Sequence, residues 1–206
     1  SGADWPQAAG PNGDFVVSTS QPVRVFSVAK NEKVRWRTKL PSTGQGTPVV
    51  SGGRIFVTSH QRIKEDTQTG STIVGLCFDA STGKELWRRK IPGTRTTDLS
   101  SLFSDNTAAS PVTDGKRVVF CNVGGTVKCF NYQGDELWSH TWTPFGRHHA
   151  RAHEPIIHEG KVILMHAPLY DLPVSATTKD GSKGLGRGRE YWTFLRAYDL
   201  ETGKLV

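Results

Sequence analysis

The chain has 206 residues, a formal net charge of +7 and 35% hydrophobic residues, which is enough length to bury a substantial core. No stretch approaches the roughly 20 apolar residues of a membrane-spanning helix, so we expect no membrane span. The 22 glycines and 11 prolines, together with many short β-branched runs and weak helical periodicity, predict an all-β protein with frequent turns.

The first recurring feature along the chain is a tryptophan. Trp36, Trp87 and Trp138 are each separated from the next by 51 residues, a period that indicates a repeated structural unit. In each unit, a Pro, an apolar run, a Gly turn and a second apolar run predict a hairpin, as in "TPVVSGGRIFVT" (47–58). A second turn, as in "GLCFDASTGKELWRRKI" (75–91), predicts two more strands. Four antiparallel strands per unit indicate the blade of a β-propeller.

The repeats divide residues 1–206 into an N-terminal segment with a leading fourth strand, two blades and an incomplete blade. The predicted bounds are 1–46, 47–91, 110–142 and 154–206, and the incomplete blade has a long insertion at 167–191. A closed propeller needs roughly 4 to 8 blades, because an open arc leaves sheet faces and strand edges unpaired. We therefore expect an N-terminal fragment with about three blades, and we expect the remaining blades to be its partner.

The recurring residues have a structural interpretation. A tryptophan near the start of each fourth strand would fill the wedge between neighbouring sheets, burying about 150–250 Å². Trp36, Trp87 and Trp138 are therefore predicted to be structural. The turn residues Asp79, Gly83, Asp199 and Gly203 belong to the same blade motif.

Two of these segments resemble a known repeat. "FDASTGKELW" (78–87) and "AYDLETGKLV" (197–206) resemble the Ala-x-Asp-x-x-Thr-Gly-x-x-x-Trp signature of the PQQ-like propeller repeat, found in quinoprotein dehydrogenases and in the propeller-type outer-membrane assembly lipoprotein. The opening "DWPQAAGPNGD" (4–14) is similar to the start of a secreted, planctomycete-like branch of that superfamily. The resemblance implies a periplasmic or secreted protein.

For a quinoprotein oxidoreductase, the resemblance also implies adjacent cysteines near the quinone, acidic calcium ligands and a tryptophan floor. The three cysteines, Cys77, Cys121 and Cys129, form no Cys-Cys pair, and no acidic cluster falls on a predicted inner strand. They also fit neither a disulfide framework nor a Cys-x-x-Cys zinc site, so we expect buried thiols. No cofactor is evident in this segment, and PQQ or a transition metal has no support from these residues.

The predicted turns and links differ in length on the two faces of the propeller. The turns within each hairpin are short, whereas longer loops fall at 60–72, 94–109, 143–154 and 167–191. In an up-and-down blade these longer loops all lie on one face, here called the long-loop face. Binding sites usually occupy loops on a rigid scaffold, so this is the predicted functional surface.

A histidine-rich segment falls on that face. His148, His149 and His153 precede a predicted inner strand, and His166 and His60 are expected near the same channel mouth. His149, His153 and His166 are candidate metal ligands, because imidazole is a common ligand. Arg147 and Arg151 interleave with the histidines, and together with His148, His149, His153 and Tyr170 they could instead bind a carboxylate, sulfate or phosphate group. Histidines hydrogen-bonded within a loop are the structural alternative.

The charge does not indicate nucleic-acid binding. The four longer loops contain nine Lys or Arg against eight acids, a balance of +1, so the excess positive charge lies elsewhere. We expect a secreted or periplasmic scaffold that binds a ligand or protein, an anionic glycan among the options, through the long-loop face. The alternatives are a quinoprotein-type oxidoreductase, or a metal- or His-dependent carbohydrate-active enzyme, in the full-length protein. Whether the protein is an enzyme stays open.

Overall fold

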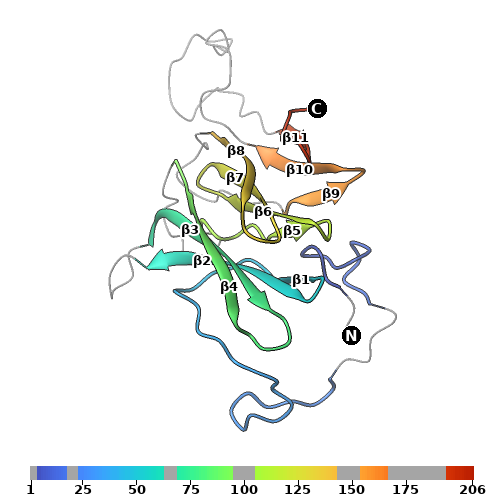
Figure 1. The fold of residues 1–206 in the computed structure, drawn as a ribbon, viewed down its shortest axis with the longest axis vertical. Coiled ribbons are helices and arrows are strands. Elements are labelled where there is room, and N and C mark those ends of the chain that lie inside the picture. The colour runs from blue at the N-terminus through green and yellow to red at the C-terminus, as the bar shows by residue number, and fades with distance from the viewer. Residues whose placement is uncertain (1–3, 18–22, 63–68, 95–104, 143–153, 167–193) are drawn as a thin grey trace, which may run out of the picture.

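The computed structural model describes residues 4–17, 23–62, 69–94, 105–142, 154–166 and 194–206 (Figure 1). These residues form eleven strands in three antiparallel sheets. No helix long and apolar enough to cross a membrane occurs in these described ranges. The arrangement is all-β, as predicted.

Each sheet is an up-and-down blade in which consecutive strands pair antiparallel. The first contains β1 (Val49–Ser51), β2 (Arg54–Arg62), β3 (Thr69–Asp79) and β4 (Glu85–Pro92). The second contains β5 (Val112–Thr113), β6 (Arg117–Asn122), β7 (Thr126–Asn131) and β8 (Glu136–Thr141). The third contains β9 (Ile156–His158), β10 (Lys161–His166) and β11 (Phe194–Asp199). The topology confirms the predicted propeller class, with about three blades present.

The three sheets stand side by side in an arc (Figure 1). The short first strands are neighbours, with β1 beside β5 and β5 beside β9, so they line the inner side of the arc. Residues 4–7 run along this side. Trp5 pairs with Val50, and the Pro6 carbonyl accepts a hydrogen bond of 2.9 Å from the Thr113 amide.

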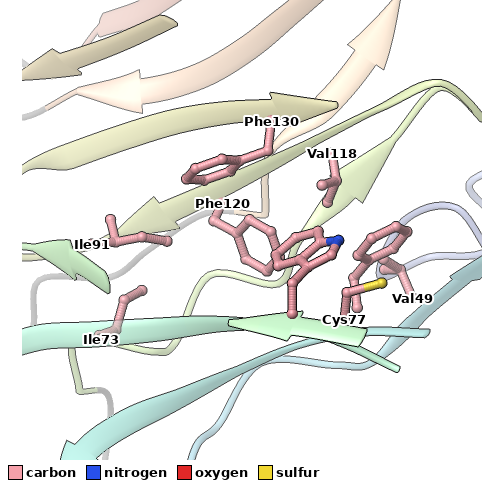
Figure 2. Close-up of a cluster of buried hydrophobic side chains, with 9 residues drawn as sticks. Val49, Ile73, Cys77, Ile91, Val118, Phe120 and Phe130 are labelled. Carbon is pink, nitrogen blue, oxygen red and sulfur yellow. The ribbon is translucent and has the colours of Figure 1, made fainter. Parts of the chain in front are cut away.

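The core lies between blades rather than within one sheet. Between the first and second sheets, Phe56, Cys77 and Trp87 pack against Val118 and Phe120, with further buried neighbours shown in Figure 2. A second cluster, which includes Val119, Cys129, Trp138, Leu164 and Tyr198, joins the second and third sheets. Because both faces of the second sheet are covered, β6 is a nearly continuous apolar run rather than an alternating one.

The three recurring tryptophans each cross a blade boundary. The indole Nε1 of Trp36 donates to Ala80 O at 3.0 Å, that of Trp87 to Tyr132 O at 3.0 Å, and that of Trp138 to Leu200 O at 2.9 Å. Each acceptor lies in the turn that follows the third strand of the next blade. Each indole also lies against a glycine of that turn, namely Gly83, Gly134 and Gly203, all with positive φ.

An acidic residue or its amide relative shapes each of these turns. Asp79 Oδ1 accepts hydrogen bonds from the backbone and hydroxyl groups of Ser81 and Thr82. Asp199 Oδ1 accepts the same pair of bonds from Thr202. Hydrogen bonds from Ser81 and Thr82 lower the pKa of Asp79 to about 2. A short, fixed turn follows from this bonding.

The region around Trp36 differs from the predicted fourth strand. Residues 33–46 are described, yet they contain no strand. A β-strand forms only where a neighbouring strand supplies backbone hydrogen-bond partners. Within residues 23–46, the β-pairing consists of a single isolated bridge between Ser27 and Glu32. Trp36 nevertheless makes the same contact with the next blade as Trp87 and Trp138.

The three cysteines are free and buried, as predicted. Burial raises the pKa of Cys121 and of Cys129 to about 12. These thiols therefore stay protonated at neutral pH and pack as small apolar side chains.

Candidate functional site

Most of the site residues predicted from the sequence lie outside the described residues. These are Arg147, His148, His149, Arg151, His153 and Tyr170. His166 ends β10, where its backbone pairs with that of Phe194. The predicted anion and metal sites therefore stay predictions.

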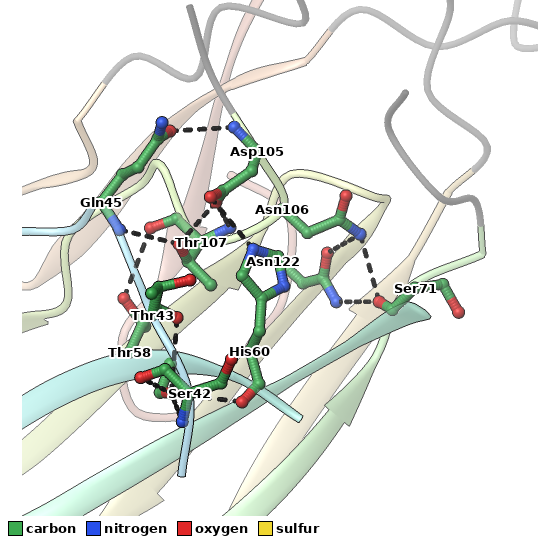
Figure 3. Close-up of polar contacts among 11 residues, drawn as sticks. Ser42, Thr43, Gln45, Thr58, His60, Ser71, Asp105, Asn106, Thr107 and Asn122 are labelled. Carbon is green, nitrogen blue, oxygen red and sulfur yellow. Dashed lines mark hydrogen bonds and ion pairs between the residues drawn. The ribbon is translucent and has the colours of Figure 1, made fainter. Parts of the chain in front are cut away.

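The described part of the long-loop face brings together two links and the ends of four strands (Figure 3). The links are residues 42–47, before β1, and residues 105–110, before β5. The strand ends belong to β2, β3, β4 and β6. β2 continues to Arg62 and β3 begins at Thr69, so the strands extend well into the loop predicted at 60–72. His60 consequently lies on a strand rather than in a loop.

The centre of this region is a buried pair, His60 and Asp105. His60 Nε2 lies 3.0 Å from Asp105 Oδ2, and the two residues are 1% and 7% exposed. Asp105 Oδ1 also accepts hydrogen bonds from the Thr107 amide (2.7 Å) and hydroxyl (2.5 Å). Burial by itself would raise the pKa of Asp105, but the His60 ring and the Thr107 bonds outweigh it and hold that pKa below its ordinary value.

His60 is incompletely satisfied. Neither ring nitrogen makes a hydrogen bond of ordinary geometry within the described residues, so the Nε2 contact with Asp105 is electrostatic, and Nδ1 has no partner there. Buried polar atoms are rarely left without partners, so His60 is a candidate for binding.

The two links are fastened to each other around this pair. The backbone N–H of Gln45 donates a hydrogen bond to Thr107 Oγ1 at 2.9 Å. The side-chain oxygen of Gln45 accepts a hydrogen bond from the backbone N–H of Asp105, also at 2.9 Å. Ser59 Oγ accepts the Ser42 amide and donates to the Ser42 carbonyl. The position of Asp105 is therefore set by both neighbouring blades.

Asn122, at the end of β6, ties the strand ends together. Its Nδ2 donates to Ser71 O at 2.8 Å and to Ile91 O at 2.7 Å. Its Oδ1 accepts bonds from Asn106 Nδ2 and the Gly124 amide. This side chain is fully buried and makes four bonds, so its role is structural.

A hydrogen-bonded relay links the residues that precede Pro48, Pro111 and Pro155. The Thr47 amide donates to Ser110 Oγ at 2.8 Å. The Ser110 amide and hydroxyl donate in turn to the two carboxylate oxygens of Glu154, at 2.7 and 2.9 Å. The relay fixes the inner links of three successive blades. In the sequence, the residue before the proline that opens each repeat marks the positions that take part in it.

Within the described residues, no group of three or more His, Cys, Asp or Glu side chains could hold a metal ion. The predicted ligands His149 and His153 lie outside those residues. What the described site offers chemically is an oriented imidazole beside a carboxylate, on a face whose links are held rigidly.

Three antiparallel sheets joined by tryptophan-to-turn contacts define part of a PQQ-like propeller. A family model described as outer membrane protein assembly factor BamB matches residues 2–74 and 68–205. The chain therefore belongs to this family of PQQ-like repeat proteins, which confirms the resemblance of the repeat segments. No curated protein sequence matches it.

The chain is also similar in fold to solved structures. Quinohemoprotein alcohol dehydrogenase ADHIIG from Pseudomonas putida HK5 is 16% identical with a TM-score of 0.45, over 82% of this chain and 21% of that one. BamB from Moraxella catarrhalis is 15% identical with a TM-score of 0.46, over 86% and 55%. Quinohemoprotein alcohol dehydrogenase from Comamonas testosteroni is 15% identical with a TM-score of 0.42, over 80% and 20%. The chain thus spans between a fifth and about half of these proteins.

Proposed function

We propose that the protein is a secreted or periplasmic scaffold that binds a ligand or a protein partner through its long-loop face. The observation that carries this proposal is the buried His60–Asp105 pair, in which His60 Nδ1 has no hydrogen-bond partner in the described part of the chain. A family fold used by assembly factors and enzymes alike supports a scaffold role without specifying the ligand.

The rigidity of the links supports a binding role. The relay through Thr47, Ser110 and Glu154 and the bonds of Gln45 hold successive blades in register at this face. Links that are already fixed in this way lose little conformational freedom when a ligand contacts them, which lowers the entropic cost of association. The opposite face, by contrast, carries short turns occupied by their own capping bonds, such as those of Asp79.

The ligand chemistry follows from the residues that join the link before β9. Arg147 and Arg151, with His149 and His153 between and beside them, offer charge-assisted hydrogen bonds to a carboxylate, sulfate or phosphate. An anionic glycan or an acidic protein surface fits this set. His60 would accept or donate one further bond from the floor of the same face.

Binding of a sulfated oligosaccharide such as a heparin hexasaccharide, by calorimetry, tests the proposal. The separate changes His149→Ala, Arg151→Ala and His153→Ala should each weaken binding about tenfold, the effect of losing one charge-assisted bond. Lys161→Ala, at the start of β10 on the opposite face, is the control and should bind normally. Thermal unfolding should be nearly unchanged. Loss of the fold in the histidine variants would make those residues structural and defeat the site assignment.

We also propose that these residues hold no redox cofactor. Elemental analysis and a visible spectrum of protein purified without chelators or a His tag provide the test. A stoichiometric transition metal or a quinone band would replace the scaffold proposal with the oxidoreductase or metal-dependent enzyme. A colourless, metal-free protein would favour the binding scaffold over both enzyme alternatives.

A further inference from the structure

The positive charge of the chain is concentrated at the outer edge of the first blade. Residues 23–41 and 84–92 together contain ten Lys or Arg against two acids, a balance of +8, whereas the whole chain carries +7. The other residues are therefore nearly neutral in total. β4 is the last strand of its sheet, on the side away from the inner strand β1. We call residues 35–41 and 84–92 the basic edge.

The two stretches of the basic edge lie side by side. Trp36 lies against Gly83, in the turn that precedes β4. Farther along the chain, Pro41 lines a hollow together with Arg88 and Lys90, which belong to the second half of β4. The segment from Trp36 to Pro41 therefore follows β4 along its length, and the cations of both stretches occupy one region of the surface.

These cations recur at fixed positions in the repeat. The first and third residues after the tryptophan are basic in both stretches, namely Arg37, Lys39, Arg88 and Lys90. The second blade has Ser139 and Thr141 at the same positions. The indole hydrogen bond to the next blade is nonetheless the same in all three repeats. Blade packing therefore does not need these charges, and they are available for another role.

The four side chains are exposed and have few counterions. Within the described part of the chain, Arg37, Lys39 and Lys90 form no ion pair with a carboxylate. Arg88 pairs with Glu85, but its side chain stays 56% exposed. Like charges gathered without counterions repel one another, so a bound anion would relieve this repulsion.

The hollow in the basic edge suits a sugar ring. Its volume is about 410 Å³, and it is lined by Pro41, Gln61, Val74, Arg88 and Lys90. Pro41 and Val74 offer apolar surface to the C–H groups of a ring, and the Gln61 amide can both donate to and accept from hydroxyls. Arg88 and Lys90 offer charge-assisted bonds to a carboxylate or sulfate. None of the five side chains is aromatic, so a nucleic-acid base would have no stacking partner among them.

We propose that the basic edge binds a linear anionic polysaccharide. One sugar occupies the hollow, with its carboxylate or sulfate group on Arg88 and Lys90, and the neighbouring sugars lie along Arg37 and Lys39. A row of cations beside a hollow matches an extended polymer, whereas a flat membrane surface would contact the cations and leave the hollow empty. The basic edge is a second binding surface, which meets the long-loop face only at Gln61.

Calorimetry with a heparin hexasaccharide at several salt concentrations tests the proposal. Arg88→Gln/Lys90→Gln should weaken binding about tenfold or more and reduce its salt dependence, because two charged contacts are lost. Arg37→Gln/Lys39→Gln should weaken it about threefold to tenfold. Gln61→Ala should weaken binding a few-fold with no change in salt dependence, since it removes only neutral hydrogen bonds.

The control removes the same charge elsewhere. Lys116→Gln/Lys204→Gln changes two exposed cations in the short turns of the opposite face, and binding should change by less than about twofold. An equal loss in this control would mean that net charge alone attracts the saccharide, which overturns the proposal. Tighter binding of duplex DNA or of phosphatidylglycerol vesicles at the same salt, lost in Arg88→Gln/Lys90→Gln, would also overturn it by assigning the edge to another partner.

The same titrations distinguish the two surfaces. In protein that already carries Arg151→Ala, the loss caused by Arg88→Gln/Lys90→Gln should keep its full size, because separate sites contribute independently. Binding that is lost in Arg151→Ala but unchanged in Arg88→Gln/Lys90→Gln would overturn the basic edge and leave the long-loop face in place. The reverse result would support the basic edge and remove the long-loop assignment.

Discussion

Trp87 donates its indole N–H to the carbonyl oxygen of Tyr132 at 3.0 Å, so a side chain from one blade is hydrogen-bonded to the backbone of the next. The indole is 7% exposed and packs 6.0 Å, centroid to centroid, from Phe130. The contact combines apolar burial with a satisfied polar group, which is why tryptophan suits this position better than phenylalanine.

Replacing Trp87 separates these two contributions. Trp87→Phe keeps an aromatic ring but leaves the Tyr132 carbonyl without its donor, and should lower the free energy of unfolding by about 1–3 kcal/mol. Trp87→Ala also opens a cavity and should cost about 3–5 kcal/mol. Leu86→Ala, at a 43% exposed neighbour, is the control and should change stability by less than about 0.5 kcal/mol. Urea denaturation measures all three, and equal losses for Leu86→Ala and Trp87→Ala would contradict the docking role.

The glycine beneath each tryptophan should be sensitive to substitution for two reasons, its positive φ and the close approach of the indole. At Gly134, with φ +88°, an added Cβ would lie 2.9 Å from the Trp87 indole. At Gly160, with φ +70°, it would meet nothing within 4 Å. Gly160→Ala should therefore cost about 1 kcal/mol, from backbone strain. Gly134→Ala should cost a further 1–3 kcal/mol or so, from overpacking. Thermal unfolding distinguishes them, and similar melting temperatures would mean that the indole shifts freely.

The fold was predictable because its signal repeats. The 51-residue spacing of Trp36, Trp87 and Trp138 reports a structural period directly, and the Gly turns divide each unit into strands. The strand around Trp36 was not correctly predicted, since pairing depends on a neighbour that local sequence does not reveal. The 60–72 loop was overestimated because β2 continues through polar residues such as Gln61, which is only partly buried.

The described site was largely invisible in the sequence. His60 and Asp105 are far apart in the chain and belong to the strand of one blade and the link of another, so no local spacing joins them. Asp105 counted only as one of the loop acids, and His60 as one of several histidines. The packing of neighbouring blades creates this pair, since it places a strand end of one blade beside the link of the next. The x-Pro steps joined by the Thr47–Ser110–Glu154 relay, in contrast, recur in all three repeats and can be found in the sequence.

The Asp79 turn predicts a specific dependence of stability on pH. Its pKa is lowered to about 2 in the folded protein, from an ordinary value of about 3.9, so its stabilising effect is complete above about pH 4. The effect is lost as the pH falls toward 2. Asp79→Asn should flatten this part of the curve, and the turn should tolerate it because Asn131 occupies the same position in the second blade. Melting temperatures from pH 5 to 2 provide the test, and parallel curves for both proteins would refute the assignment.

The buried pair should be far more sensitive than a surface pair of similar length. Asp105→Ala removes the carboxylate beside His60 and the Oδ1 atom that accepts two hydrogen bonds from Thr107, leaving buried polar groups unpaired, and should cost about 3–5 kcal/mol. Lys128→Ala breaks the 2.7 Å contact with Glu136, whose side chain is 40% exposed, and should cost less than about 1 kcal/mol. Because Asp105 has a lowered pKa, its contribution is present above the unfolded-state value and declines as the pH falls through the folded one. The stability gap between wild type and Asp105→Ala should therefore narrow in acid, and a gap that stays constant from pH 7 to 3 would show that the ionised carboxylate is not what stabilises this face.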